Sequence, residues 1–461
     1  MRKATLFTVT LFTALAATTV ARAAGDDVEP NWASIDARPT PAWFEDAKLG
    51  IFIHWGVYSV PAFAPTKDPD IYARYAEWYW KRSTDPEMGG YSAFNAFHDR
   101  VYGEDTKYPD FAPRFEAEMY DPAAWADVFS RAGAKYVVLT SKHHDGFCLW
   151  PSQQSWNWNA VDVGPHRDVA GDLLKAVRAE GLKMGFYYSL YEWMNPLYLS
   201  DVDAYVETHM LPQMKDLVTR YEPDILWTDG EWDHPSERWR ATEFLAWLFN
   251  ESPVGDTVAV NDRWGKETRG KHGGYYTTEY GLVHADEAEE VIPHPWEECR
   301  GIGYSFGYNR AETLADYSTP EELVEILVDT VARGGNLLLD IGPTADGRIP
   351  VIMEERLLQL GEWLETNGEA IYATRKWREH AEGEAIRYTA KDGVVYATVL
   401  GWPGNTVTLK TPKSSGSTKV RLLGSEEKVR FKRPGGGLRI TMPDSATPGA
   451  LAYTFELAGV K

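Results

Sequence analysis

The sequence predicts an α/β protein in which a (β/α)-barrel, TIM-like or an irregular variant of it, precedes a C-terminal all-β sandwich. From about residue 45 to 368, short apolar strands alternate with amphipathic helices, which is the pattern of a parallel sheet with helices outside it. After residue 368 the pattern changes to short strands separated by turn residues. The 461 residues also exceed one typical domain of about 100 to 200 residues. We therefore expect a barrel domain at residues 24–368 and a sandwich at 369–461.

The barrel prediction rests on six apolar strands, at residues 48–55, 135–141, 183–190, 224–230, 257–264 and 336–343. A complete barrel needs eight strands, so either the barrel is irregular or further strands lie in the long loops. Amphipathic stretches predict helices at residues 121–134, 168–181, 203–221, 241–250 and 319–335. Asp121 followed by Pro122 is a helix start, and Thr319 is the expected cap of the last of these helices.

The C-terminal region reads as strands and turns. Residues 384–400 form two alternating runs on either side of Asp392-Gly393, which is a hairpin signal. Further short strands are expected within 405–412, 417–424, 428–443 and 451–459. About 90 residues of this kind predict a sandwich of two antiparallel sheets.

The N-terminus has the features of a targeting segment. Arg2 and Lys3 precede an apolar, uncharged stretch at residues 4–20, and Ala21 and Ala23 form a small-x-small cleavage pattern. We expect a signal peptide at residues 1–23 and an exported protein, either periplasmic or secreted. A membrane anchor is the alternative, but the apolar run is short and rich in Ala and Thr. No other stretch approaches the roughly 20 apolar residues of a membrane-spanning helix.

Composition narrows the classes of partner. The formal net charge of −21 disfavours nucleic acids and anionic membranes. The 19 Trp and 25 Tyr suit sugar recognition, and they suit a large apolar core nearly as well. Only two cysteines occur, Cys148 and Cys299, so a disulfide framework is excluded while their pairing stays open. A glycine-rich phosphate loop and a GxSxG elbow are both absent, which disfavours nucleotide enzymes and serine hydrolases.

Polar side chains gather where the predicted strands end. In a parallel barrel these ends meet at one mouth, and here they carry His54, His143, His144, Asp145, Tyr187, Tyr188, Asp229, Arg263 and Glu279. Such a mouth suits glycoside cleavage, in which one carboxylate attacks the anomeric carbon and a second carboxylic acid protonates the leaving oxygen. Asp229 ends a strand whose apolar residues are Ile225, Leu226 and Trp227, which fixes its position, and Gly230 would let another backbone or a ligand approach closely.

Eight ordered blocks lie between residues 42 and 343, namely WFEDAKLGIFIHWGVYSVP, EWYWKRS, KYVVLTSKHHDGFCLW, WTDGEW, VNDRWG, TTEYG, WEECRGIGYSFGYNR and GGNLLLDIGP. Together they resemble the α-L-fucosidases of glycoside hydrolase family 29. The resemblance implies a retaining exo-hydrolase of fucosylated oligosaccharides or glycoconjugates, with a covalent fucosyl-enzyme intermediate and with no metal or cofactor. It also implies that Asp229 is the nucleophile and Glu279 the acid/base. The fucose-contacting positions would be His54, Glu77, Trp78, His143, His144, Tyr188 and Arg263.

Several of these assignments have alternatives. Glu77 is a second acid/base candidate, or else a helix-surface carboxylate paired with Lys81. Arg263 would bind sugar hydroxyls or form a structural ion pair, and Tyr187 competes with its neighbour Tyr188.

Two other classes of function also remain open. A metal-dependent hydrolase would use His54, His143, His144 and Asp145, although adjacent residues rarely both reach one ion. A non-catalytic sugar-binding protein is the other class, and the presence of both Asp229 and Glu279 argues against it.

Overall fold

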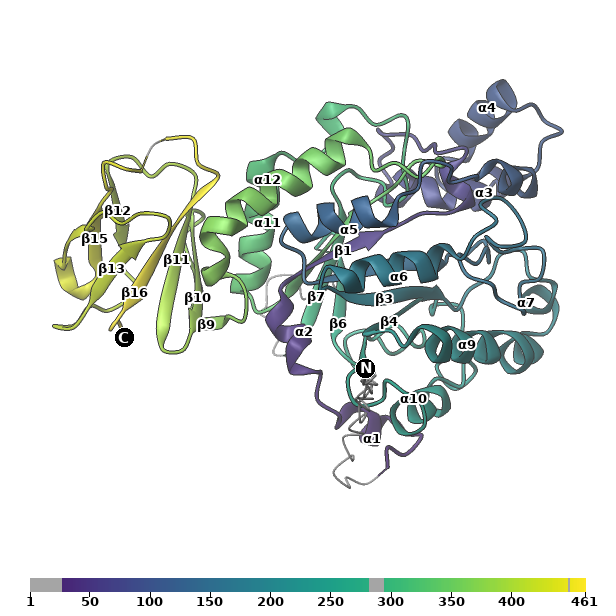
Figure 1. Ribbon diagram of the computed structural model, residues 1–461, viewed down its shortest axis with the longest axis horizontal. Coiled ribbons are helices and arrows are strands. Elements are labelled where there is room, and N and C mark those ends of the chain that lie inside the picture. Colours follow the sequence, from purple (N-terminus) through teal and green to yellow (C-terminus); the bar gives the residue numbers. More distant parts are fainter. Residues whose placement is uncertain (1–26, 282–293, 447) are drawn as a thin grey trace, which may run out of the picture.

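The barrel domain is built around an eight-stranded parallel sheet (Figure 1). The computed structural model describes residues 27–281, 294–446 and 448–461, so the predicted signal peptide lies outside the described residues. The strands lie in the order β5-β4-β3-β2-β1-β8-β7-β6, and a parallel bridge between Asn261 and Tyr275 joins the two ends of that order. Their bounds are β1 (Leu49–Ile53), β2 (Tyr136–Lys142), β3 (Lys183–Ser189), β4 (Ile225–Asp229), β5 (Ala259–Val260), β6 (Tyr276–Glu279), β7 (Trp296–Gly301) and β8 (Asn336–Ile341). The barrel prediction is confirmed.

Six of these strands match the apolar runs in the sequence, whereas β6 and β7 have no such run. Strand β7 contains Glu297, Glu298 and Arg300, yet both glutamates are buried. Burial of these polar groups is tolerated because each has hydrogen-bond donors; Glu297, for example, accepts from the Trp227 indole. Apolar patterning alone therefore could not reveal this strand.

Helices cover the outside of the sheet, and the predicted caps are present. The main helices are α5 (Pro122–Arg131), α6 (Val169–Ala179), α9 (Leu211–Tyr221), α10 (Ala241–Asn250), α11 (Pro320–Ala332) and α12 (Val351–Asn367). The Asp121 carboxylate accepts from two backbone N–H groups of α5, and Thr319 forms a capping box with Glu322 on α11. Strand β5 leads to β6 without a helix, which is one irregularity of this barrel.

The predicted helix at 203–221 consists of three segments: α8 (Val202–Tyr205), a π-helical turn at Val206–Met210, and α9. A long connection between β1 and α5 holds α3 (Tyr79–Thr84), α4 (Tyr91–Val101) and the 3-10 turns Ile71–Arg74 and Ala76–Trp78. Figure 1 shows α3, α4 and α7 (Pro196–Ser200) on the side of the barrel away from the C-terminal sheets. Two short helices, α1 (Trp32–Asp36) and α2 (Ala42–Ala47), precede β1.

The C-terminal region is the predicted sandwich. One sheet has the order β13-β16-β11-β10-β9 and the other the order β12-β15-β14. The strands are β9 (Arg375–Glu382), β10 (Ile386–Lys391), β11 (Val394–Leu400), β12 (Thr406–Leu409), β13 (Lys419–Leu422), β14 (Arg430–Lys432), β15 (Leu438–Thr441) and β16 (Ala452–Ala458). Strands β10 and β11 pair around Asp392 and Gly393, which both have positive φ, so the hairpin prediction is confirmed.

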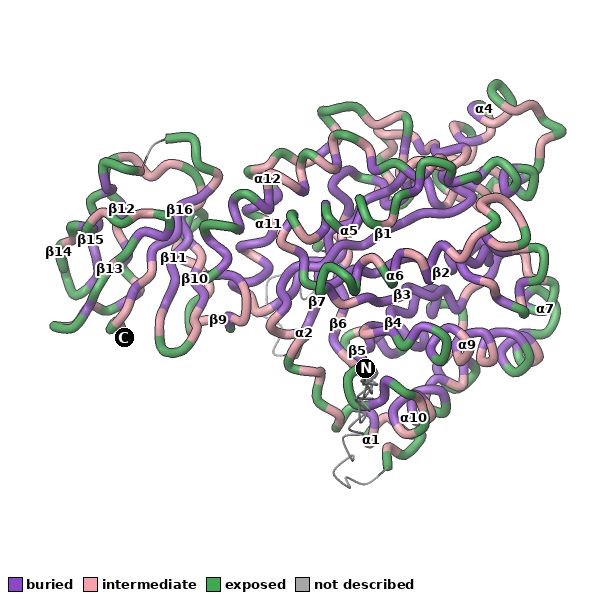
Figure 2. The backbone as a smooth tube through the Cα atoms, viewed as in Figure 1, coloured by how far each residue is buried: buried purple, intermediate pink, exposed green. Residues whose placement is uncertain are grey.

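Helices α11 and α12 lie between the barrel and the C-terminal sheets (Figure 1). Arg387 of β10 forms an ion pair with Asp329 of α11, which ties the two parts together. Figure 2 shows that strands β2 and β3 are buried over most of their length, whereas loops around the barrel are exposed. Within the described part of the chain, no helix has both the length and the apolar character needed to cross a bilayer.

Candidate active site

A cavity of about 580 Å³ opens where the barrel strands end. Its wall includes every site residue predicted from the sequence except Tyr188, namely His54, Glu77, Trp78, His143, His144, Asp229, Arg263 and Glu279. Strands β1, β2, β4 and β6 thus bring their terminal polar side chains to one place, as the barrel geometry requires.

Asp229 ends β4 and is held on both carboxylate oxygens. Arg263 Nη1 lies 2.6 Å from Oδ1, and the Tyr187 hydroxyl donates to Oδ2 over 2.9 Å. Gly230 has a φ of +74°, and a Cβ there would lie 2.6 Å from the Cβ of Tyr191. The glycine is therefore needed for the close approach of the segment after β3, which packs against the turn and fixes the nucleophile candidate.

The electrostatic surroundings keep Asp229 ionised. Burial alone would raise the pKa of its carboxyl, but the positive charge of Arg263 acts in the opposite direction, and the charge of Arg269 adds to it. The net effect lowers the pKa of Asp229 to about 2. A carboxylate with this pKa is available as a nucleophile throughout the ordinary pH range.

Glu279 ends β6 and shares a cation with Asp229. Tyr75 donates its hydroxyl to Oε1 over 2.9 Å, and Arg263 Nη2 lies 3.4 Å from Oε2. A third Arg263 nitrogen, Nε, donates to the Thr277 hydroxyl over 2.9 Å. Arg263 therefore forms the ion pair that the sequence left open, and it also lines the cavity.

Two buried histidines have one ring nitrogen fixed by the protein. His54 Nδ1 lies 2.6 Å from Asp340 Oδ1, and His144 Nδ1 lies 2.6 Å from Ser189 Oγ. Burial lowers the pKa of His54 to about 3 and that of His144 to about 4, so both rings are neutral.

The tautomer of His144 follows from its neighbour. The Ser189 hydroxyl donates its hydrogen to the Tyr191 carbonyl, so it must accept from His144 Nδ1–H. Nε2 of His144 then carries a lone pair, 3.7 Å from Asp229 Oδ2. Such a nitrogen is an acceptor for a ligand hydroxyl.

Glu77 is buried at the cavity wall and is not a surface residue. Its Oε2 accepts from the Gly307 amide over 2.8 Å, and burial raises its pKa to about 7. Lys81 pairs instead with Asp85, so the helix-surface interpretation of Glu77 is wrong. A protonated glutamic acid here would be a donor inside the pocket.

Tyr188 does not belong to the site. Its hydroxyl donates to Gln213 over 2.8 Å in the buried layer outside the sheet, whereas Tyr187 lines the cavity and contacts Asp229. Successive residues of a strand point to opposite faces, so a shift of one residue in the assignment changes the face. The prediction of Tyr188 is corrected to Tyr187.

Three further cavity residues were not assigned from the sequence. Tyr75, which binds Glu279, lies between two 3-10 turns in the long β1–α5 connection, where no periodic pattern marks it. Arg269 bridges Asp229, at 3.6 Å, and Glu231, at 2.5 Å. Glu231 stands two residues after Asp229 in WTDGEW, but its ion pair with Arg269, 38 residues away, is not indicated by that motif.

The four residues of the metal-hydrolase alternative are not assembled around a common point. Asp145 accepts from the Tyr108 hydroxyl over 2.7 Å and does not line the cavity, while His54 is bound by Asp340. Across the described residues, no group of three or more His, Cys, Asp or Glu side chains is arranged to hold a metal ion. Cys148 and Cys299 are both buried and are not bonded to each other.

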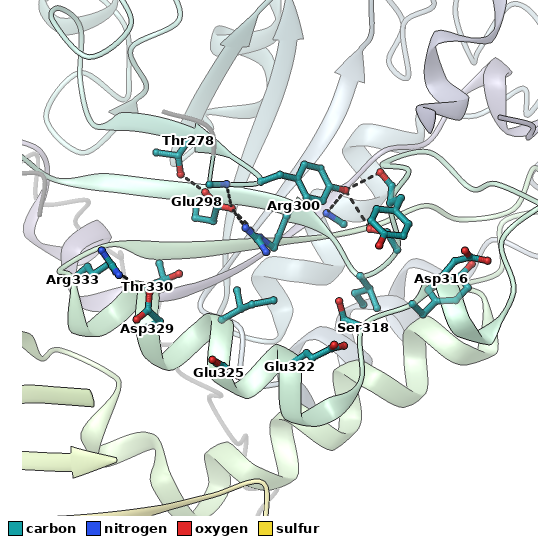
Figure 3. Close-up of a pocket in the computed structure, with 18 of the residues that line it drawn as sticks. Thr278, Glu298, Arg300, Asp316, Ser318, Glu322, Glu325, Asp329, Thr330 and Arg333 are labelled. Carbon is teal, nitrogen blue, oxygen red and sulfur yellow. Dashed lines mark hydrogen bonds and ion pairs between the residues drawn. The ribbon is translucent and has the colours of Figure 1, made fainter. Parts of the chain in front are cut away.

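A second cavity, of about 660 Å³, lies between strands β6 and β7 and helix α11 (Figure 3). Glu322, Glu325 and Asp329 come from one helix, and Arg300 points against Glu298 (Figure 3). Asp329 is paired with Arg333. Because Glu298 and Asp329 are paired with arginines and neither Asp229 nor Glu279 lines this cavity, we place the candidate site in the first one.

Comparison with known proteins agrees with this geometry. The model of the family described as alpha-L-fucosidase matches residues 15–369, and the model of the alpha-L-fucosidase C-terminal domain matches residues 380–458. The tissue alpha-L-fucosidase of Homo sapiens is 44% identical over 446 residues, covering 94% of this chain and 92% of that protein. The plasma alpha-L-fucosidase of Rattus norvegicus is 48% identical over 412 residues, covering 86% and 85%. The Thermotoga maritima alpha-fucosidase in complex with a mechanism-based inhibitor has a TM-score of 0.80 and 38% identity, covering 93% of this chain and 99% of that chain.

Proposed function

Because this chain belongs to the α-L-fucosidases of glycoside hydrolase family 29, we propose that it cleaves α-L-fucosidic bonds by double displacement with retention of configuration. Hydrolysis of α-L-fucosides follows from the family itself. The proposal concerns the mechanism, the roles of Asp229 and Glu279, and the removal of terminal fucose from glycans.

In the first step the Asp229 carboxylate attacks the anomeric carbon of the fucosyl residue. The bond from that carbon to the leaving oxygen breaks, and Glu279 in its acid form gives its proton to that oxygen. The products are a β-linked fucosyl ester on Asp229 and a free alcohol. Arg263 and Tyr187 orient the attacking carboxylate through their contacts with its two oxygens.

In the second step Glu279, now a carboxylate, takes a proton from a water molecule. The water oxygen attacks the anomeric carbon from the face that the leaving group vacated, and the ester bond to Asp229 breaks. Free L-fucose leaves as the α-anomer. No step of this sequence uses a cofactor.

The observation that carries this proposal is that one guanidinium contacts both carboxylates. Arg263 contacts Asp229 through Nη1 and Glu279 through Nη2, at 2.6 and 3.4 Å. A retaining pair lies about 5 to 5.5 Å apart, whereas an inverting pair leaves room for water at about 6.5 to 9.5 Å. Two carboxylates held on a single side chain favour the shorter separation.

The rest of the wall suits a 6-deoxy sugar. Neutral His54 and His144 present hydrogen-bonding nitrogens for hydroxyl groups, and Trp78 offers an apolar surface for the C6 methyl.

The N-terminal sequence supports a second proposal, that the chain is exported after cleavage behind Ala23. N-terminal sequencing of the secreted protein tests it.

The direct test of the mechanism is the configuration of the first product. Proton NMR during hydrolysis of an aryl α-L-fucoside should show the α-anomer of fucose first, before mutarotation. A β-anomer formed first contradicts double displacement, and binding of the fucoside without turnover contradicts the enzymatic function altogether.

A further inference from the structure

We propose that the outer part of the active-site cavity is a leaving-group subsite for an uncharged pyranose residue, with Tyr72 and Trp232 as its main contacts. We call this outer part the rim, and it consists of Asp70, Tyr72, Glu87, Met88, Trp232 and Lys266. The inference rests on the proposed function, because it extends the same cavity outward from the fucose position.

The cavity has a gradient of burial that separates two compartments. The side chains around Asp229, such as His54 and Arg263, are buried, whereas Tyr72 is 48% exposed and Trp232 is 36% exposed. The cavity volume of about 580 Å³ lies within the range of about 300 to 1,000 Å³ that holds a drug-sized ligand. One deoxyhexose is much smaller than such a ligand, so the cavity has room for a second residue beyond the fucose.

Tyr72 lies on the side of the cavity where the leaving group departs. Its ring packs edge-on against Tyr75 with centroids 5.7 Å apart, and the Tyr75 hydroxyl binds Glu279. Tyr72 and Glu279 line the same cavity, where burial and the negative charge of Glu279 raise the pKa of the Tyr72 phenol. Since Glu279 protonates the leaving oxygen in the proposed mechanism, Tyr72 stands next to the leaving residue.

The segment that carries Tyr72 is held in place before any ligand binds. Asp70 accepts from the Tyr72 amide over 3.0 Å, and Arg74 donates twice to the Asp68 carbonyl. The Arg74 guanidinium also lies 4.8 Å from the centre of the Tyr304 ring. A contact surface that is already ordered loses little entropy on binding, so it can contribute to affinity.

Trp232 supplies a second fixed aromatic surface at the same opening. Its ring contacts His144 at 5.4 Å and Tyr191 at 5.9 Å in edge-on geometry, and it lies nearly parallel to Trp78 at 6.2 Å. These contacts hold the indole while about a third of the residue stays exposed. The electron-rich face of an aromatic ring attracts the C–H groups of a pyranose, which a flat aliphatic wall does less well.

The charges of the rim favour an uncharged leaving residue. Asp70 and Glu87 contribute negative charge and Lys266 contributes one positive charge. Among the other cations that line the cavity, Arg269 is paired with Glu231 at 2.5 Å and with Asp229, and Arg82 is paired with the rim residue Asp70 at 3.7 Å. With no excess of cations, the rim has no electrostatic preference for a carboxylate or a sulfate group.

The test compares two substrates that share the fucosyl group and differ in what leaves. α-L-Fucosyl fluoride has no residue to occupy the rim, whereas an α-L-fucosyl-galactose disaccharide has an uncharged one. We expect Tyr72→Ala and Trp232→Ala each to lower the ratio of disaccharide to fluoride kcat/KM by about tenfold, the size of a lost pocket contact. Trp156→Ala is the matched control, because Trp156 is 77% exposed and does not line the cavity, and its ratio should equal that of the wild type.

An unchanged ratio in both rim variants overturns the inference, even if both rates fall together. Faster cleavage of a fucoside whose leaving residue is a uronic acid than of the galactose disaccharide overturns the uncharged class. The failure of the proposed function looks different, since the wild-type protein would then release β-fucose first from the fluoride, or no fucose. Fluoride hydrolysis also reports that each variant is folded.

Discussion

Two buried carboxylates of the barrel, Asp229 at its mouth and Glu297 in its interior, have the same number of hydrogen-bond donors and opposite pKa shifts. Asp229 accepts from the Tyr187 hydroxyl and from an Arg263 N–H. Glu297 accepts from the Tyr136 hydroxyl at 2.5 Å and from the Trp227 indole N–H at 2.8 Å. The pKa of Asp229 is lowered to about 2, while burial raises that of Glu297 to about 7.

The difference between the two sites is the charge of the nitrogen donor. Burial penalises the ionised form in both places, and neutral donors offset only part of that penalty. At the mouth the guanidinium adds a full positive charge in direct contact, whereas in the interior the same Arg263 acts on Glu297 only as a weaker influence. Trp227 separates the two environments, since its indole binds Glu297 and its ring faces the guanidinium at 4.4 Å.

Removing the carboxylate at the mouth should have the largest effect. We expect Asp229→Gly to lose at least about 10⁴-fold in kcat for every leaving group, because the first step has no nucleophile. Azide would enter from the vacated side and give β-fucosyl azide, identified by NMR. Asp224→Asn is the control: Asp224 precedes the same strand at its other end and binds Lys183. A similar loss in that variant would point to damage of the strand rather than of catalysis.

The loss of activity on substitution of Glu279, which shares Arg263 with Asp229, should depend on the leaving group of the substrate. Glu279→Ala should slow natural fucosides by about 10²- to 10⁴-fold and nitrophenyl fucosides much less, because nitrophenolate leaves without a proton. Azide needs no base, so it should restore turnover of the aryl substrate and give α-fucosyl azide. Glu77→Ala should mainly raise KM. If Glu77→Ala instead shows the leaving-group dependence and the α-azide, the acid/base is Glu77.

Arg263→Met would make the mouth resemble the interior. Asp229 would keep the Tyr187 donor and the more distant Arg269 at 3.6 Å, but it would lose the guanidinium in direct contact, so its pKa should rise. The nucleophile works only when ionised. In the wild type this group therefore limits kcat/KM only near pH 2, and in the variant the acid limb of the pH profile should move upward. A pH profile of kcat/KM checks this, and an unshifted limb would show that Arg263 does not control Asp229.

The sequence predicted those parts of the fold that follow from apolar periodicity. Strands β1 to β4 and β8 are continuous apolar runs, and α5 and α11 begin at Asp121 and Thr319 as their capping chemistry indicates. Strand β7 was not predicted because it is not an apolar run, and its buried Glu297 bonds partners that only the closed barrel supplies. The bonds from Tyr136 and Trp227 to Glu297 span 161 and 70 residues, a separation that no local pattern encodes.

The site was predictable to the extent that it sits on strand ends. Asp229, Glu279 and His54 end or follow strands, so their convergence follows from the parallel topology. Tyr75 and the rim residue Tyr72 come from the long β1–α5 connection, whose path depends on tertiary contacts such as the bond from the Ala76 amide to Ser305. Tyr187 and Tyr188 are both aromatic and adjacent, so the sequence could not decide which one faces inward.

The Glu297→Gln variant tests the protonation state of the interior carboxyl through the pH dependence of the free energy of unfolding. A carboxyl whose pKa rises to about 7 on folding keeps its proton while the unfolded chain loses it, so the free energy of unfolding should fall as pH rises from about 4.5 to 7. Glutamine can accept from Trp227 and donate to Tyr136, and it does not titrate. The variant should therefore lose up to about 3 kcal/mol of this pH dependence. Denaturant unfolding of both proteins at pH 5 and pH 7 measures this difference. An equal change in the free energy of unfolding between the two pH values for both proteins would contradict a protonated Glu297.

The smallest effect separates the two neighbouring tyrosines of β3. Tyr187→Phe removes the neutral donor from Asp229 and should lower kcat by about tenfold, with little change in stability because the ring still packs. Tyr188→Phe removes the bond to Gln213 in the buried layer and should cost about 1 kcal/mol of stability with kcat unchanged. Measurement of kcat and of the free energy of unfolding should show the loss of kcat only in Tyr187→Phe and the loss of stability mainly in Tyr188→Phe.

The pH profile of Tyr187→Phe should differ from that of Arg263→Met. Arg263 should keep Asp229 ionised in Tyr187→Phe, so the acid limb of its pH profile should stay in place. A loss of kcat in Tyr188→Phe would return that residue to the active site.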